Sequence, residues 1–232
     1  MLLGLPEFEL VSTDTVEETC ALLARYGEGT RVFAGGTDLF VKMKHRRAVP
    51  RRLINIKRIP NLGQIRREAR GGLRIGALTT IQAIEASSAI DKDFPSLKQA
   101  AGVLGTTQIR NVGTLGGNLS NASPSAEFGP SLLTLGASVK CTGRAGERVI
   151  PLEEFFVGPG KTSLGRDELL TEVTVPEPPA GAQCIYLKHS LRRMDVAIAS
   201  AAVLIVAEGD VCTEVRIALG AVGPKPYRAT KA

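Results

Sequence analysis

Two glycine-rich segments carry the residues whose types and spacing best suit chemistry in this chain. The first is Val32-Phe33-Ala34-Gly35-Gly36-Thr37-Asp38-Leu39, and the second is Gly113-Thr114-Leu115-Gly116-Gly117-Asn118. Because both segments have little side-chain bulk, their backbone N–H groups can approach an anion closely. Each segment alone is more typical of a tight turn. Together, with matching small polar residues, they predict a diphosphate that is held from two sides, as in a dinucleotide.

The common nucleotide-binding motifs do not occur in the sequence. Neither Gly-x-Gly-x-x-Gly nor Gly-x-x-x-x-Gly-Lys-Ser/Thr is present, so we expect the dinucleotide to bind outside a Rossmann unit. The four cysteines, Cys20, Cys141, Cys184 and Cys212, are widely spaced and favour small core residues in a reducing compartment. Without a Cys-x-x-C pair, a His–carboxylate cluster or a nucleophile motif, the sequence predicts neither a metal site nor a catalytic residue.

The composition is that of an ordinary folded chain with an excess of basic residues. Its 232 residues are 44% hydrophobic and include 25 glycines and 13 prolines, which indicate many turns between short elements. The net charge is +6, and residues 39–67 include ten lysines or arginines and no acidic residue. That basic segment is either a solvated surface or a dock for a phosphate-bearing ligand or an acidic partner protein. Nucleic acid is the least favoured partner because aromatic residues do not alternate with the charges.

The hydrophobic pattern predicts an α+β protein with two mixed lobes and a β-rich tail. We expect a helix over 15–26, capped by Asp14 and ended by Gly27. Further helices are expected at 80–86, 95–104 and 130–135, and strands at 31–34, 53–56, 73–76, 138–141, 169–175, 184–188, 196–207 and 211–219. The proline-rich stretch 176–181 is the clearest linker. The longest apolar run, 196–207, is too short to span a bilayer, and no signal-peptide pattern opens the chain, so we expect a cytoplasmic protein.

At its glycine-rich segments the chain resembles the FAD-binding subunit of the molybdenum hydroxylases. This family includes the medium subunit of carbon monoxide dehydrogenase and the flavin domain of xanthine dehydrogenase. The matching stretches are 34–39, 73–80, 108–124 and 192–197, in the family's order. The resemblance implies a two-lobed FAD-binding domain of the vanillyl-alcohol oxidase/molybdopterin dehydrogenase type over 1–176, with lobes at about 1–56 and 57–176. It also implies a partial C-terminal α/β domain over 182–232, truncated after its strands, which would then lack covering helices.

The resemblance also implies a role for each matching residue. Backbone N–H groups of residues 32–39 and 113–118 would hold the FAD diphosphate. Glu127 stands where the family usually has an aspartate that binds ribose hydroxyls, and Leu170 stands where a residue packs near the flavin. Lys188 is either a cation close to the flavin, which would stabilise negative charge on its reduced form, or a solvated lysine on a strand.

The function that the resemblance implies is electron transfer. A large partner subunit would carry molybdopterin, and a small one would carry [2Fe–2S] clusters. Electrons would then pass through FAD on this chain to NAD or another acceptor. One alternative is a self-sufficient FAD-dependent reductase of the same fold, which would purify without such partners. Another is a basic scaffold protein without a cofactor, which would show no flavin absorbance.

Overall fold

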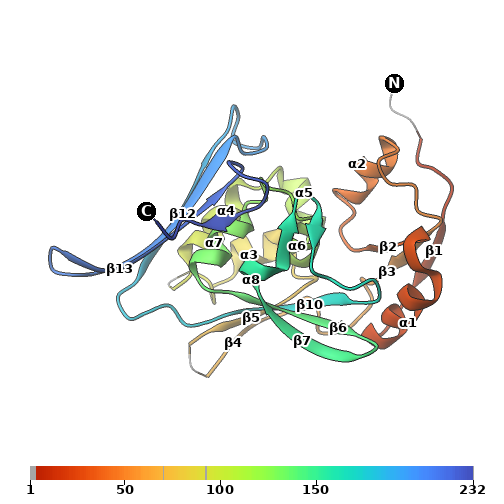
Figure 1. Ribbon diagram of the computed structural model, residues 1–232, viewed down its shortest axis with the longest axis horizontal. Coiled ribbons are helices and arrows are strands. Elements are labelled where there is room, and N and C mark those ends of the chain that lie inside the picture. Colours follow the sequence, from red (N-terminus) through yellow and green to blue (C-terminus); the bar gives the residue numbers. More distant parts are fainter. Residues whose placement is uncertain (1–3, 70, 92, 232) are drawn as a thin grey trace.

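The first lobe is a small parallel sheet with helices in its connections. The computed structural model describes residues 4–69, 71–91 and 93–231. Its first sheet has the order β1-β3-β2, with β1 at Glu9–Ser12, β3 at Arg52–Asn55 and β2 at Thr30–Phe33. The connecting helices are α1 (Val16–Tyr26), the 3-10 turn η1 (Gly27–Gly29) and α2 (Leu39–Lys44). In Figure 1 this lobe is red to orange and lies at one end of the molecule.

Helix α1 shows how local sequence sets the first lobe. The helix begins after Thr15, whose hydroxyl accepts a hydrogen bond from the Glu18 N–H at 3.1 Å. The prediction that Asp14 caps this helix is wrong, because the Asp14 carboxylate pairs with Arg58 at 2.8 Å. The helix ends at Gly27, whose φ of 58° favours glycine, as the sequence predicts.

The second lobe is built on a five-stranded antiparallel sheet. Its order is β4 (Ile65–Arg67), β5 (Leu73–Gly76), β10 (Leu169–Val175), β6 (Ser138–Gly143) and β7 (Gly146–Pro151). Of these five strands, β10 is the last in sequence but lies at the centre of the sheet, where it pairs with β5 and β6. Its residues are buried on both faces and rich in apolar and β-branched types, which suits a central strand.

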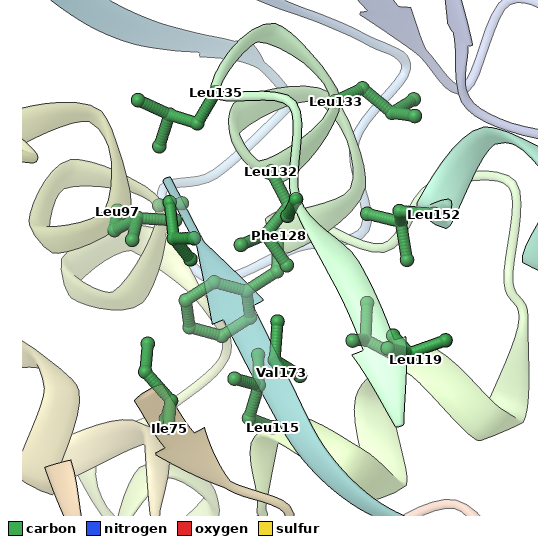
Figure 2. Close-up of a cluster of buried hydrophobic side chains, with 14 of the residues drawn as sticks. Ile75, Leu97, Leu115, Leu119, Phe128, Leu132, Leu133, Leu135, Leu152 and Val173 are labelled. Carbon is green, nitrogen blue, oxygen red and sulfur yellow. The ribbon is translucent and has the colours of Figure 1, made fainter. Parts of the chain in front are cut away.

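Helices from the connection between β5 and β6 cover one face of this sheet (Figure 1). They are α3 (Ile81–Ala86), α4 (Pro95–Val103), α5 (Thr107–Val112), α6 (Leu115–Asn121) and α7 (Phe128–Thr134). A short unit of α8 (Leu152–Phe155), β8 (Phe156–Gly158) and β9 (Lys161–Thr162) follows β7. Figure 2 shows the core between helices and sheet, where the Phe128 ring lies among Ile75, Leu97, Leu115 and Val173. All five side chains are at most 1% exposed, so this cluster joins α4, α6 and α7 to the strands.

The C-terminal part forms a separate antiparallel sheet, as predicted. Its order is β11 (Gln183–His189), β12 (Ala199–Glu208), β13 (Val211–Gly220) and β14 (Tyr227–Arg228). Strand β12 begins at Ala199 rather than Val196, because residues 190–198 form a loop. One face packs on α4 and α7 and buries Ala202, Leu204 and Ala218 completely. The expectation that these strands lack covering helices is therefore wrong for this face.

The other face of the C-terminal sheet is exposed and apolar. Ile185 and Leu187 alternate with buried residues along β11, and Ile205 and Val215 are opposite partners in β12 and β13. Cys212 is exposed at the end of this sheet, whereas the other three cysteines are buried as predicted. No helix in the described ranges is long and apolar enough to cross a membrane.

The architecture confirms the predicted fold class: two lobes of mixed helix and sheet, then a β-rich tail.

Candidate functional site

A cavity of about 530 Å³ lies between the two lobes. Its walls come from the β2–α2 connection of the first lobe, from α6 and the following loop, and from the start of β10. Part of its lining is apolar, including Ile56, Leu78, Ile81, Leu104 and Ile109. A cavity with one apolar wall and a few converging polar groups suits a ligand with a flat ring and a charged tail.

The structure brings most of the predicted site residues to this cavity. All seventeen lie in the described part of the chain, and only Phe33, Leu115 and Lys188 fall outside the lining. Phe33 packs on Phe40, Leu115 is fully buried in the core, and Lys188 lies behind the wall. The predicted residues that line the cavity are Val32, Ala34, Gly35, Gly36, Thr37, Asp38, Leu39, Gly113, Thr114, Gly116, Gly117, Asn118, Glu127 and Leu170.

The first glycine-rich segment offers unused backbone donors. None of the five backbone N–H groups from Gly35 to Leu39 donates to an acceptor within the described ranges. Gly36 has a φ of +74°, and a Cβ there would lie 2.6 Å from the Phe33 ring and 2.9 Å from the Phe40 ring. Successive N–H groups around a left-handed residue form an anion-binding concavity. This segment can therefore hold a phosphate without a cationic side chain.

Gly35 joins the two glycine-rich segments. A Cβ at Gly35 would lie 2.1 Å from the carbonyl oxygen of Val112 and 2.9 Å from the Cα of Gly113. Only glycine permits this close approach of the first lobe to the end of α5. The prediction that the segments converge on one site is thus consistent with their direct contact.

The second glycine-rich segment is a helix start rather than a loop. Its N–H groups donate within the protein: Leu115 to the Thr79 carbonyl at 3.0 Å, Gly116 to the Ala77 carbonyl at 2.9 Å, and Gly117 to the Thr114 hydroxyl at 3.1 Å. The expectation that this segment presents free backbone donors is wrong for these three residues. This segment instead presents the Asn118 side chain to the cavity. The buried Oδ1 of Asn118 has no hydrogen-bond partner in the part of the chain described, so it can accept a hydrogen bond from a ligand.

A chain of three polar side chains in the cavity lining connects the two lobes. The Asn121 side-chain amide donates to an Asp38 carboxylate oxygen at 3.0 Å, and the Lys42 ammonium donates to the Asn121 amide oxygen. Desolvation raises the pKa of Asp38, and the charge of Lys42 opposes this rise. The three side chains thus connect the start of α2 to the end of α6, and Lys42 brings a positive charge to the lining.

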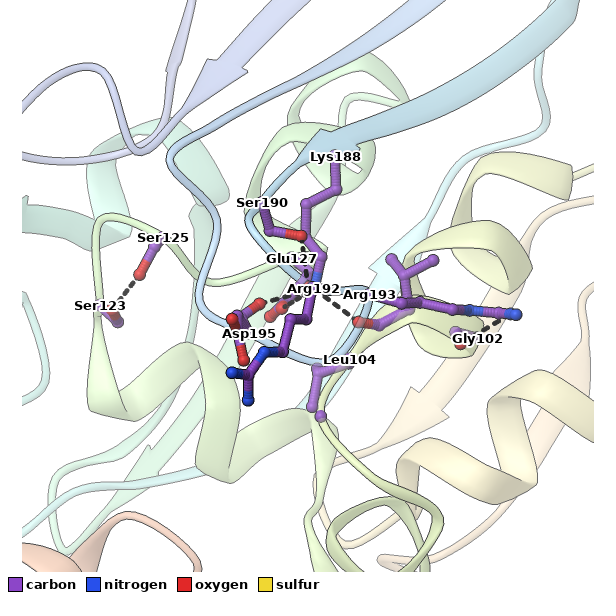
Figure 3. A network of polar contacts seen from close by, with 12 residues as sticks. Gly102, Leu104, Ser123, Ser125, Glu127, Lys188, Ser190, Arg192, Arg193 and Asp195 are labelled. Atoms are coloured by element: carbon purple, nitrogen blue, oxygen red, sulfur yellow. Dashed lines mark hydrogen bonds and ion pairs between the residues drawn. The ribbon is translucent and has the colours of Figure 1, made fainter.

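Glu127 is the buried acid of the site. It lines the cavity with 8% of its surface exposed, and burial raises the pKa of its carboxyl despite the nearby Lys188 ammonium. Figure 3 shows Lys188 reaching Glu127 from β11, with an Nζ–Oε1 distance of 3.3 Å. The carboxylate can accept hydrogen bonds from hydroxyl groups of a ligand in the cavity.

These features fit FAD. The unused N–H groups from Gly35 to Leu39 suit a diphosphate, the carboxylate of Glu127 suits ribose hydroxyls, and the apolar wall that includes Leu170 suits a ring system. In the described ranges, no three His, Cys, Asp or Glu side chains gather into a group that could hold a metal ion.

Sequence reasoning missed several residues of the lining. Lys42 and Asn121 were not assigned to the site, although Asn121 lies in the stretch that resembles the family and Lys42 lies in the basic segment. Met194, Asp195 and Val196 also line the cavity, from the loop between β11 and β12. Their occurrence in the matching stretch 192–197 is the signal that could have found them.

Two family models match consecutive parts of this chain. The model described as FAD binding domain in molybdopterin dehydrogenase matches residues 6–178. The model described as CO dehydrogenase flavoprotein C-terminal domain matches residues 185–232.

Individual relatives are similar over nearly the whole chain. The 6-hydroxypseudooxynicotine dehydrogenase complex subunit alpha of Paenarthrobacter nicotinovorans is 36% identical, over 98% of this chain and 77% of that protein. The carbon monoxide dehydrogenase medium chain of Afipia carboxidovorans is 32% identical, over 97% of this chain and 78% of its own length. A solved carbon monoxide dehydrogenase from Hydrogenophaga pseudoflava, which lacks the Mo-pyranopterin moiety of its molybdenum cofactor, superposes with a TM-score of 0.95 at 34% identity. That superposition covers 98% of this chain and 79% of the solved chain.

Proposed function

The chain belongs to the family of FAD-binding subunits of molybdopterin dehydrogenases, and from that premise we propose that it passes electrons from a partner subunit to an electron acceptor. The chain is thus the flavoprotein subunit of an oxidoreductase. When bound, FAD supplies the group that takes up electrons from partner iron–sulfur clusters and passes them to NAD or another acceptor. The proposed partners are a large molybdopterin subunit and a small iron–sulfur subunit, in the cytoplasm.

The unused N–H groups from Gly35 to Leu39 are the observation that carries this proposal. Five donors at one cavity wall, without acceptors in the described residues, are costly unless a ligand or water accepts from them. We assign the diphosphate to this segment. Thr114 and Asn118 face the same cavity and add side-chain hydrogen bonds.

The remaining residues orient the cofactor and exclude water. Glu127 accepts hydrogen bonds from ribose hydroxyls, and Leu170 packs against the ring. We further propose that residues 1–176 form the cofactor-binding domain and residues 182–232 a second domain. The fully buried Ala202, Leu204 and Ala218 then belong to the interface between them.

Two measurements test the proposed function. The chain purified with its partner subunits is expected to contain one FAD, measured as flavin released on denaturation. Addition of the chemically reduced iron–sulfur subunit should bleach the flavin absorption bands, and NAD or a quinone should restore them. A chain without flavin, or a flavin that stays oxidised while the partner clusters are oxidised by NAD, would refute the proposal.

A further inference from the structure

The ammonium group of Lys188 is buried and fully used. Its side chain is 2% exposed, and Nζ donates to the Val103 carbonyl at 2.6 Å, to the Asp195 carbonyl at 3.0 Å and to Glu127 Oε1 at 3.3 Å. An ammonium group has three N–H donors. Because these three acceptors satisfy them all, no donor is left for a ligand in the cavity. The sequence-based alternative of a solvated lysine is wrong, because the side chain is buried, and a cation close to the flavin stays a prediction.

The three acceptors belong to three different elements around the cavity. Val103 is the last residue of α4, Glu127 precedes α7, and Asp195 lies within the loop of residues 190–198 (Figure 3). Arg193 of the same loop donates to the Gly102 carbonyl at 3.4 Å. Two cations therefore meet the carboxyl end of α4, where the helix dipole favours positive charge.

The loop of residues 190–198 is partly exposed. It projects between β11 and β12, is closed at its base by a hydrogen bond from the Ile198 N–H to the His189 carbonyl, and leaves Leu191 and Val196 largely exposed. Met194, Asp195 and Val196 nevertheless line the cavity. The hydrogen bond from Lys188 to the Asp195 carbonyl ties this stretch to β11.

We propose that Lys188 is a positioning residue: its ammonium binds and stabilises the Glu127 carboxylate and holds residues 194–196 in the cavity wall at the same time. This inference rests on the proposed function, because it treats Glu127 and the loop as parts of the FAD site. Lys188 acts through these groups and does not touch the cofactor.

The electrostatic surroundings of Glu127 make this role measurable. Tyr186 and Lys188 face it from β11, and Asp38 acts on it from the start of α2. Lys188 is the cation bonded to the carboxylate, whereas the charge of Asp38 opposes ionisation. Without the ammonium, the pKa of Glu127 is expected to rise further, because the main charge that opposes the effect of burial is lost.

The test is a set of variants measured by FAD titration from about pH 6 to about pH 9. Lys188→Met removes the charge but keeps the length of the side chain. Glu127→Gln and the double variant E127Q/K188M remove the titrating group. Lys225→Met is the matched control, because Lys225 also donates to two backbone carbonyls, those of Glu153 and Phe156, but lies outside the cavity lining.

K188M is expected to weaken FAD binding roughly 10- to 100-fold at neutral pH, since hydrogen bonds to charged groups contribute about 1.5–3 kcal/mol. The loss should shrink as pH rises, whereas in E127Q/K188M it should not change with pH. A loss in K188M that is independent of pH and equal to that of the double variant would overturn the proposal.

Hydrogen exchange in the FAD-free protein tests the second half of the proposal. Residues 190–198 are expected to exchange faster in K188M than in the unmodified chain, and K225M should leave them unchanged. Unchanged exchange in K188M would refute the role of Lys188 in holding the loop. Because this measurement needs no cofactor, it separates failure of the Lys188 proposal from failure of FAD binding itself.

Discussion

Replacing Gly116 by alanine tests whether α6 is held by backbone contact against Ala77, the residue that follows β5. A Cβ at Gly116 would lie 2.6 Å from the Ala77 Cβ and 2.8 Å from the Ala77 carbonyl oxygen. That same oxygen accepts a hydrogen bond from the Gly116 N–H at 2.9 Å. The added methyl group must therefore push α6 away from the sheet and lengthen this bond, since neither neighbour is a flexible side-chain end.

The expected cost follows from three contributions. Overpacking a tight contact costs about 1–3 kcal/mol. Weakening one backbone hydrogen bond costs about 1 kcal/mol. The higher helix propensity of alanine returns about 1 kcal/mol. We therefore expect Gly116→Ala to lower the free energy of unfolding by roughly 1–3 kcal/mol.

Urea unfolding of the FAD-free protein measures this difference, and Gly102→Ala is its control. Gly102 also lies within a helix, but a Cβ there would meet only the flexible end of Glu85, at 3.3 Å from Oε1. Helix propensity alone then predicts a gain of up to about 1 kcal/mol. Opposite signs for the two glycine-to-alanine changes are the expected result. Equal effects, or a G116A protein as stable as the unmodified chain, would refute the close-contact argument.

Three further predictions concern the cavity and the basic segment. Gly36→Val should weaken FAD binding at least about tenfold, because a β-branched residue is strained at positive φ by about 1–3 kcal/mol, and full FAD occupancy would contradict the proposed diphosphate site. Burial raises the pKa of Glu127, so between its ordinary and its raised pKa the folded chain keeps a proton that the unfolded chain releases. Unfolding of the FAD-free protein, measured at several pH values, should therefore show that the free energy of unfolding of the unmodified chain falls relative to that of E127Q as pH rises between these two pKa values. A free energy of unfolding that rises relative to E127Q would contradict the prediction. Reversing the exposed Lys44 and Arg47 to glutamate should slow association with partner subunits at low salt, measured by stopped-flow mixing, and an unchanged rate would favour a plain solvated surface.

Elements with local signals could be predicted from the sequence. Gly27 ends α1 and Thr80 caps α3 through a hydrogen bond from the Ala83 N–H, so those boundaries were predicted within a residue. The start of α6 was missed for a physical reason. Its glycines indicate a turn locally, yet Gly116 is there because Ala77, distant in sequence, packs against it. A contact between residues so far apart in sequence does not change the hydrophobic periodicity of the segment around Gly116, so the sequence pattern could not reveal it.

The sequence predicted which segments line the site, but not what each residue in them does. Small residues at Gly35 and Gly36 correctly indicated close backbone approach. The sequence could not show that the amides near Gly116 are used internally while those near Gly36 are not, because tertiary hydrogen bonds decide this. The acceptors of Lys188 likewise lie on three separate elements, so its role emerges only once those elements are folded together.

The central position of β10 has a consequence for synthesis of the chain. Leu73 of β5 pairs with Val175 of β10, about a hundred residues later, and long-range pairing of this kind forms slowly. While the ribosome is still translating the stretch between them, β5 and β6 have emerged with an unpaired edge each, and Phe128 lacks its contact with Val173 of β10. Nascent chains in that interval expose edges that invite intermolecular pairing. The cofactor cavity, whose wall includes Leu170 of the same strand, closes only after this step. We therefore expect FAD to bind after this sheet is complete, and to stabilise the folded subunit rather than to guide its early folding.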